Sequence, residues 1–102
     1  MKKIVAGKSY DTGTAEQVGY LESSVGRSDF EFYEEGLYLT DNGNWFLAGE
    51  GHAKTKYAKR FDDGAWGMGE GVIPLTKGEA REWLERNVTA EEYKKYFKPE
   101  EV

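Results

Sequence analysis

"FYEEGLYLTDNGNWFLAGEG", at residues 32–51, is the stretch that decides the fold. Asn42-Gly43 lies between two apolar runs, and this dipeptide is preferred in the two-residue type I′ turn of a β-hairpin. Such a turn predicts a register in which Thr40 faces Trp45. One face would then hold Leu37, Leu39, Phe46 and Ala48, and the other would hold Tyr38, Thr40, Trp45 and Leu47. Because both faces are apolar, we expect this hairpin at the centre of a sheet.

Strands are also expected on both sides of this hairpin. Before it, alternating apolar residues at about 3–9 and 15–22 flank "DTGT", whose residues favour a turn. After it, "EGVIPLT" at 70–76 predicts a further strand, in which Pro74 favours a sheet edge or a strand end.

The C-terminal quarter of the chain predicts helices. Thr76 with Glu79, and Thr89 with Glu92, have the spacing of two capping boxes. Strands followed by helices are typical of the α+β class. We therefore predict a single α+β domain over residues 1–102, with an antiparallel β-sheet of about five strands, a central hairpin and two short C-terminal helices.

Composition excludes several classes of protein. The 102 residues include no cysteine, which excludes disulfides and thiolate metal sites. Fourteen Lys and Arg against nineteen Asp and Glu give a formal charge of −5, which argues against an unspecific DNA coat. The N-terminal "MKKIVAGKSY" is too polar for a secretory signal, and no apolar run approaches the about 20 residues of a membrane span. A cytoplasmic protein without a membrane partner is expected.

Residues 45–61, "WFLAGEGHAKTKYAKRF", look at first like a phosphate-binding loop after a strand. That motif needs two glycines at fixed positions before its Lys-Thr pair, and this chain has Ala48 and Ala53 at those positions before Lys54. The loop should also open a helix, whereas a hairpin strand precedes it here. The glycines at 64–71 lack the spacing of a dinucleotide fingerprint. No nucleotide or other cofactor is predicted.

The predicted register places Glu35 opposite Glu50, with His52 two residues further on. Like charges directly opposed in a sheet are destabilising. The pair could serve acid–base chemistry or bind a metal with His52. Alternatively, a bulge near Gly36 or Gly49 could turn both carboxylates into solvent. One histidine and no cysteine leave too few converging groups for a catalytic or metal site, so we expect a protein that is not an enzyme.

Charge is segregated along the middle of the chain. No Lys or Arg occurs at 28–50, which holds six acids, Asp29, Glu31, Glu34, Glu35, Asp41 and Glu50. Residues 51–61 reverse the sign, with Lys54, Lys56, Lys59 and Arg60 beside Tyr57 and Phe61. The basic segment could follow phosphates while Tyr57 stacks on a base, or it could equally pair with the neighbouring acids. The acidic segment could steer a basic protein surface instead, and solvation alone would also explain both.

Several stretches together resemble a family of small proteins carried by bacterial plasmids, phages and conjugative elements. The resemblance covers residues 10–85, and its pattern consists of Tyr10-Asp11-Thr12, Thr14-Ala15, Glu35, Leu37-Tyr38, Gly43, Trp45-Phe46-Leu47, Gly49-Glu50-Gly51, Tyr57-Ala58, Pro74-Leu75, Glu79-Ala80 and Trp83. The family commonly has a second glycine after Gly-Glu-Gly, where this chain has His52.

The resemblance implies a setting and no reaction. Small acidic proteins of mobile elements often inhibit host defences, so it implies an anti-CRISPR or anti-restriction protein that binds a host nuclease complex. The partner-binding residues would be acids of the hairpin region, Asp29, Glu31, Glu34, Glu35 and Asp41. The alternative is a nucleic-acid-binding accessory protein, whose contacts would be Lys54, Lys56, Tyr57, Lys59 and Arg60.

Overall fold

The computed structural model describes residues 1–102. Its strands are β1 (Lys2–Val5), β2 (Lys8–Asp11), β3 (Glu16–Glu22), β4 (Tyr33–Leu39), β5 (Trp45–Gly51), β6 (Lys59–Arg60), β7 (Trp66–Gly67) and β8 (Gly69–Leu75). Its helices are α1 (Lys77–Asn87) and α2 (Ala90–Tyr93). Neither helix is long and apolar enough to cross a membrane.

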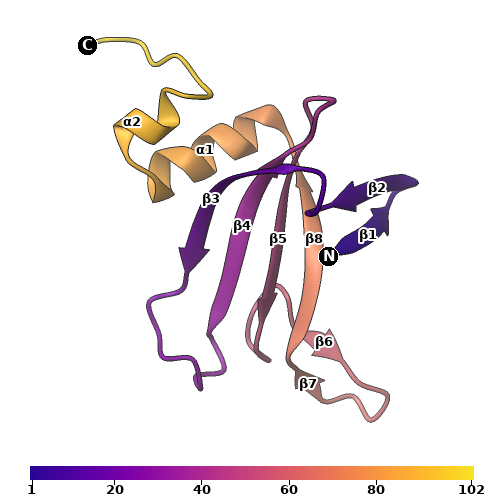
Figure 1. The fold of residues 1–102 in the computed structure, drawn as a ribbon. Helices are drawn as coiled ribbons and strands as arrows, with labels where there is room; N and C mark the ends of the chain where they lie inside the picture. The colour runs from indigo at the N-terminus through magenta and orange to yellow at the C-terminus, as the bar shows by residue number, and fades with distance from the viewer.

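The strands form three antiparallel sheets (Figure 1). The largest has four strands in the order β3-β4-β5-β8, while β1 pairs only with β2 and β6 only with β7. The predicted α+β class with antiparallel strands and two short helices is therefore confirmed. The expected sheet of about five strands is replaced by eight strands in three sheets, with the β4–β5 hairpin at the centre of the largest.

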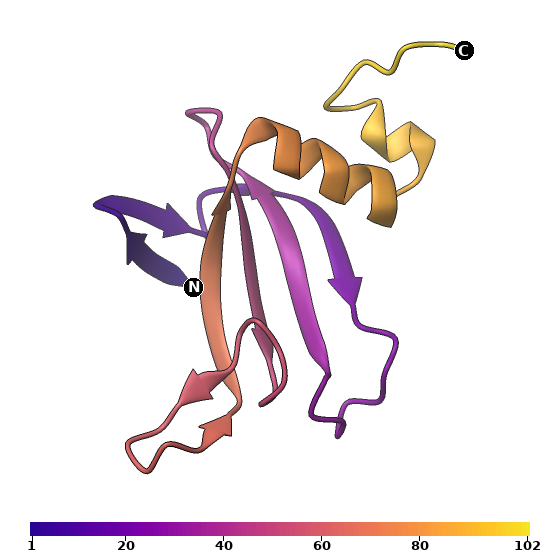
Figure 2. The same ribbon diagram turned by 180° about the vertical axis from the view of Figure 1, so that it is seen from behind.

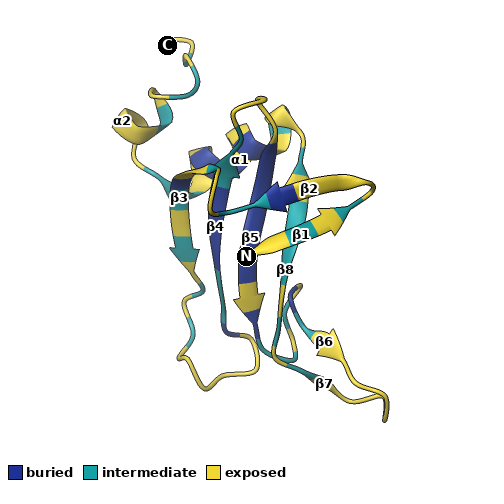
Figure 3. Cartoon of the chain, turned by 45° about the vertical axis from the view of Figure 1, so that its right-hand side comes forward, coloured by how far each residue is buried: buried dark blue, intermediate teal, exposed yellow.

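The two faces of the four-stranded sheet are covered differently (Figures 1 and 2). Helix α1 packs across one face. The opposite face, called here the open face, is covered in part by the β1–β2 hairpin, where Tyr10 packs on Phe46 and Ala48. Figure 3 shows β2 crossing in front of buried β5. The β6–β7 hairpin, called here the arm, projects from the end of the sheet at which β8 begins.

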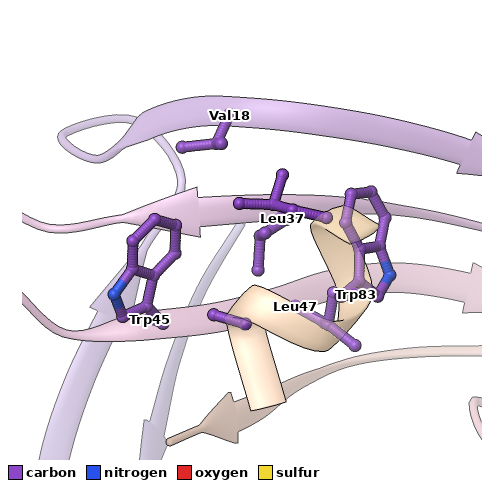
Figure 4. Close-up of a cluster of buried hydrophobic side chains, with 7 residues drawn as sticks. Val18, Leu37, Trp45, Leu47 and Trp83 are labelled. Atoms are coloured by element: carbon purple, nitrogen blue, oxygen red, sulfur yellow. The ribbon is translucent and has the colours of Figure 1, made fainter. Parts of the chain in front are cut away.

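The main core lies between the sheet and α1 (Figure 4). Helix α1 begins at Thr76, whose Oγ1 accepts a hydrogen bond from the Glu79 backbone N–H while its own N–H donates to the Glu79 carboxylate. This capping box confirms the predicted helix start and directs one side of α1 onto the strands. The residues buried there are Val18, Leu37, Trp45, Leu47, Ala80, Trp83 and Leu84.

The predicted hairpin register is wrong by one residue. Leu39 faces Trp45, and Leu37 faces Leu47. The loop has three residues instead of two, because Thr40 pairs with Asn44 and the Gly43 N–H donates to the Thr40 carbonyl. A type I′ turn needs positive φ at two consecutive residues, but only Gly43 has it here, at 84°. A shift of one residue moves the side chains of β5 to the opposite face from the predicted one, relative to those of β4. Leu37, Leu39, Trp45 and Leu47 therefore share the face that packs on α1.

Other predicted elements differ in detail. Residues 3–9 are not one strand but parts of β1 and β2, which a turn at Ala6-Gly7 separates, and both turn residues have positive φ. The expected edge position of the strand with Pro74 is confirmed, because β8 is an outer strand of its sheet. The second helix also begins at its predicted cap, where Thr89 Oγ1 accepts from the Glu92 N–H.

Candidate interaction surface

Four glutamates form a row across the open face, one from each strand of the main sheet. Cross-strand pairing places Glu22 opposite Glu34, Glu34 opposite Glu50, and Glu50 opposite Glu70. Side chains of directly paired residues point to the same face, and Glu34 and Glu50 each lie two residues from the open-face positions Gly36 and Ala48. We call these residues the glutamate row: Glu22, Glu34, Glu50 and Glu70.

The row is neutralised mainly at its ends. Arg27 Nη2 lies 2.8 Å from Glu22 Oε1 and 3.9 Å from Glu34 Oε2, and Lys3 Nζ lies 3.9 Å from Glu70 Oε1. No salt bridge reaches Glu50. The centre of the row therefore carries the least compensated negative charge.

The pKa values of Glu34 and Glu50 shift in opposite directions, because a protonated Glu50 can donate a hydrogen bond to Glu34. The Tyr20 hydroxyl and that bond lower the pKa of Glu34. The bond to Glu34, with burial and the charges of Glu34 and Glu70, raises the pKa of Glu50. As the pH falls, Glu50 therefore takes up a proton before Glu34 does.

A groove of about 240 Å³ adjoins the row on the open face. Gly36 and Ala48 face each other on adjacent strands beneath it and are both buried, Gly36 under the Tyr38 ring and Ala48 against Tyr10. The side chains around it come from the N-terminus and from strands β3, β4 and β5: Met1, Gln17, Tyr20, Glu34, Tyr38 and Glu50. The groove is thus lined by the Tyr20 and Tyr38 side chains and is acidic along the rim that Glu34 and Glu50 form.

Glu35 lies on the other face and is buried, with 2% of its surface exposed. Its Oε1 accepts from the Tyr57 hydroxyl at 2.7 Å and lies 2.8 Å from Lys56 Nζ, while its Oε2 accepts from Trp83 Nε1 at 2.8 Å. Burial and the bond to Glu35 raise the pKa of Tyr57 far above its usual 10.0, so its hydroxyl remains a donor. Glu35 therefore joins the sheet, α1 and the loop after β5.

Gly49 makes room for this arrangement. A Cβ at Gly49 would lie 2.8 Å from the Tyr57 ring and 2.4 Å from the Glu34 carbonyl oxygen. The absence of a side chain lets the ring lie against β5, with its hydroxyl on Glu35. This explains the first glycine of Gly49-Glu50-Gly51 by packing, without a ligand.

The five predicted partner-binding acids are not brought together. Glu34 belongs to the row, whereas Glu35 is buried and presents no charge to a partner. Asp41 lies in the loop of the central hairpin, at the opposite end of the strands. Asp29 Oδ1 accepts from the Glu31 backbone N–H at 2.7 Å in the loop between β3 and β4. Sequence reasoning missed Glu22 and Glu70, which only the strand order places beside Glu34.

The predicted opposition of Glu35 and Glu50 is wrong, because the register places Gly49 opposite Glu35. His52 lies away from both carboxylates, with its Nε2 at 2.8 Å from the Arg27 carbonyl oxygen. No group of three or more His, Cys, Asp or Glu residues is arranged to hold a metal ion.

Only part of the predicted basic segment is available to a nucleic acid. Tyr57 is buried and cannot stack on a base, and Lys56 pairs with Glu35. Lys54, Lys59 and Arg60 remain exposed. Arg60 lies on the arm, 5.9 Å from the centre of the Trp66 ring. Trp66 and Phe61 are exposed aromatic residues of the arm, and neither belongs to the predicted nucleic-acid contacts.

Comparison with protein-family models, curated proteins and solved structures found no match.

Proposed function

We propose that this chain is a non-enzymatic inhibitor from a bacterial mobile element, which binds a basic surface of a host nuclease complex of the CRISPR or restriction type. The observation that carries the proposal is the glutamate row. Like charges directly opposed across strands cost folding stability. A cationic partner surface would offset that cost, and it would complement the uncompensated centre of the row.

The row would also favour a basic protein surface over a nucleic acid as the partner. Phosphates are repelled by four aligned carboxylates, whereas the basic groove of a nucleic-acid enzyme is attracted. The resemblance to proteins of mobile elements supplies the setting, and the charge supplies the mode of binding. The partner's own substrate would be excluded because it needs the same basic groove.

The test begins with capture of the partner. The tagged chain is incubated with a bacterial host lysate, and the retained proteins are identified by mass spectrometry. The association rate of the purified partner is then measured with the wild type and with Glu34→Lys/Glu50→Lys, at two salt concentrations. The variant should associate at least about tenfold more slowly, and its rate should depend less on salt, because such charges act mainly on the on-rate.

The matched control is Glu82→Lys/Glu91→Lys, which makes the same change in net charge at exposed positions of α1 and α2. Thermal unfolding confirms that each variant is folded. Equal association rates for both double variants would refute the role of the row. An oligonucleotide is assayed in parallel with Lys59→Glu/Arg60→Glu. Tight binding that this variant abolishes would support the nucleic-acid alternative instead.

A further inference from the structure

The arm exposes an unusual amount of apolar surface. Trp66 is 55% exposed, Met68 56% and Phe61 46%. Arg60 lies over the Trp66 ring, and Lys59 lies 5.7 Å from the centre of the Phe61 ring. Tryptophan, arginine and methionine are enriched at the centres of protein interfaces. The arm also stands apart from the main sheet, because β6 and β7 pair only with each other (Figure 2).

The groove on the open face has the complementary properties. Its lining includes the half-exposed Tyr20 and the Tyr38 ring, which lies over Gly36. Its rim carries Glu34, whose Oε2 lies 3.9 Å from Arg27 Nη2, and Glu50, which no salt bridge reaches. A planar indole with a neighbouring guanidinium fits such a site, because the ring can stack on the tyrosines while the cation meets the carboxylates.

The arm and the row also occupy the same end of the molecule. Lys59 and Met68, at the base of the arm, line a cleft together with Glu50 and Glu70. A second copy turned by a two-fold axis near this end could therefore receive one arm and donate the other. In such an isologous dimer each arm meets the groove of the other copy, so no arm or groove is left free to bind a third copy.

We propose that two copies of this chain associate by exchanging arms, with Trp66 of each copy in the groove of the other and Arg60 against Glu50 and Glu34. A second copy is favoured over a nucleic acid because Asp62 and Asp63, at the tip of the arm, repel phosphates as the row does. The inference extends beyond the proposed inhibition, and it does not depend on any host partner.

The test is sedimentation velocity of the purified full chain over a range of concentrations. The wild type should show a monomer–dimer equilibrium. Arg60→Glu and Glu50→Arg should each raise the dimer dissociation constant at least about tenfold, because each creates two like-charge contacts. An equimolar mixture of the two variants should dimerise again, since the Arg60→Glu arm then meets the Glu50→Arg groove, and the unmodified arm meets the unmodified groove.

The apolar half of the contact is tested by Trp66→Ala, which should also weaken the dimer at least about tenfold. Phe30→Ala is the matched control, because Phe30 is 64% exposed on the loop before β4 and lines neither surface. A chain that is monomeric at every concentration would overturn the proposal. So would a dimer that Trp66→Ala and both charge reversals leave unchanged, or a mixture that fails to recover. None of these outcomes depends on capture of a host protein, so self-association and inhibition are tested separately.

Discussion

Glu35 is a charged residue whose partners all lie inside the molecule. Glu35→Ala leaves the Tyr57 hydroxyl and the Trp83 N–H without their acceptor, whereas Lys56, with 43% of its side chain exposed, can turn toward water. We expect a loss of about 2–4 kcal/mol in the free energy of unfolding, from two buried donors at about 1–3 kcal/mol each with partial relaxation. Urea unfolding followed by tryptophan fluorescence measures it.

Two further variants separate this effect from a general loss of charge. Tyr57→Phe removes one donor and leaves the carboxylate with two partners, so a smaller loss of about 1 kcal/mol is expected. Glu82→Ala removes an exposed acid of α1 and should change little. A Glu35→Ala protein as stable as Glu82→Ala would contradict the structural role of Glu35. The sequence shows Glu35 only as one acid among six, because its partners are 21, 22 and 48 residues away.

At the scale of the element, the central hairpin shows where local rules are sufficient and where they are not. The pairing of the two apolar runs and the positive φ of Gly43 could be predicted from Asn-Gly alone. The loop length could not. Thr40 Oγ1 accepts from the Asn44 N–H, which favours the longer closure. The resulting register also directs Trp45 and Leu47 to α1 with Leu37. Packing against a helix 30 or more residues away thus decides the register.

The turn itself is tested by Gly43→Val. A Cβ at Gly43 would meet nothing within 4 Å, so any cost arises from the backbone conformation alone. We expect a loss of about 1 kcal/mol or more, because a β-branched residue is strained at positive φ. Gly43→Asn is the control and should cost less, since asparagine tolerates this region better. Thermal unfolding compares the two, and equal melting temperatures for valine and glycine would exclude a turn of this kind.

The helix cap of α1 makes a second prediction at this scale. Thr76→Ala removes the acceptor of the Glu79 N–H and should cost about 1 kcal/mol of stability. Thr89→Ala removes the same bond at α2, which has four residues and none buried, so its loss should be smaller. Urea unfolding of both variants gives the comparison. A larger effect at Thr89 would mean that α2 contributes more to the fold than its burial indicates.

At the scale of the whole molecule, charge is organised by strand order and not by position in the sequence. The acid-rich segment at 28–50 was visible without a structure, but it contributes only Glu34 and Glu50 to the glutamate row. Glu22 and Glu70 enter the row from β3 and β8, on either side of the central hairpin. The arm could not be predicted from the sequence either, because its two strands have only two residues each and show no periodic pattern. Surfaces formed by non-local pairing could not be predicted from composition.

The glutamate row should make stability depend on pH in a defined direction. A raised pKa in the folded state means that the folded protein binds the Glu50 proton more tightly than the unfolded chain does. The contribution of Glu50 to stability is therefore complete below the ordinary glutamate pKa of 4.5 and is lost as the pH rises through the folded value. Glu34 has the opposite dependence, because its pKa is lowered.

Glu50→Gln isolates this effect, because a glutamine amide can donate to Glu34 at every pH, as Glu50 does only when protonated. We expect the variant to be more stable than the wild type at pH 7, by up to about 1 kcal/mol, the usual scale of an opposed cross-strand pair. The gain should shrink toward zero near pH 4, where Glu50 gains its own proton. Urea unfolding at both pH values measures it, with Glu82→Gln as an exposed control that should change little. A gain equal at pH 4 and pH 7 would contradict the shared proton. A loss at pH 7 would mean that Glu50 already has a cationic partner, and the row would then have no uncompensated centre for a partner to bind.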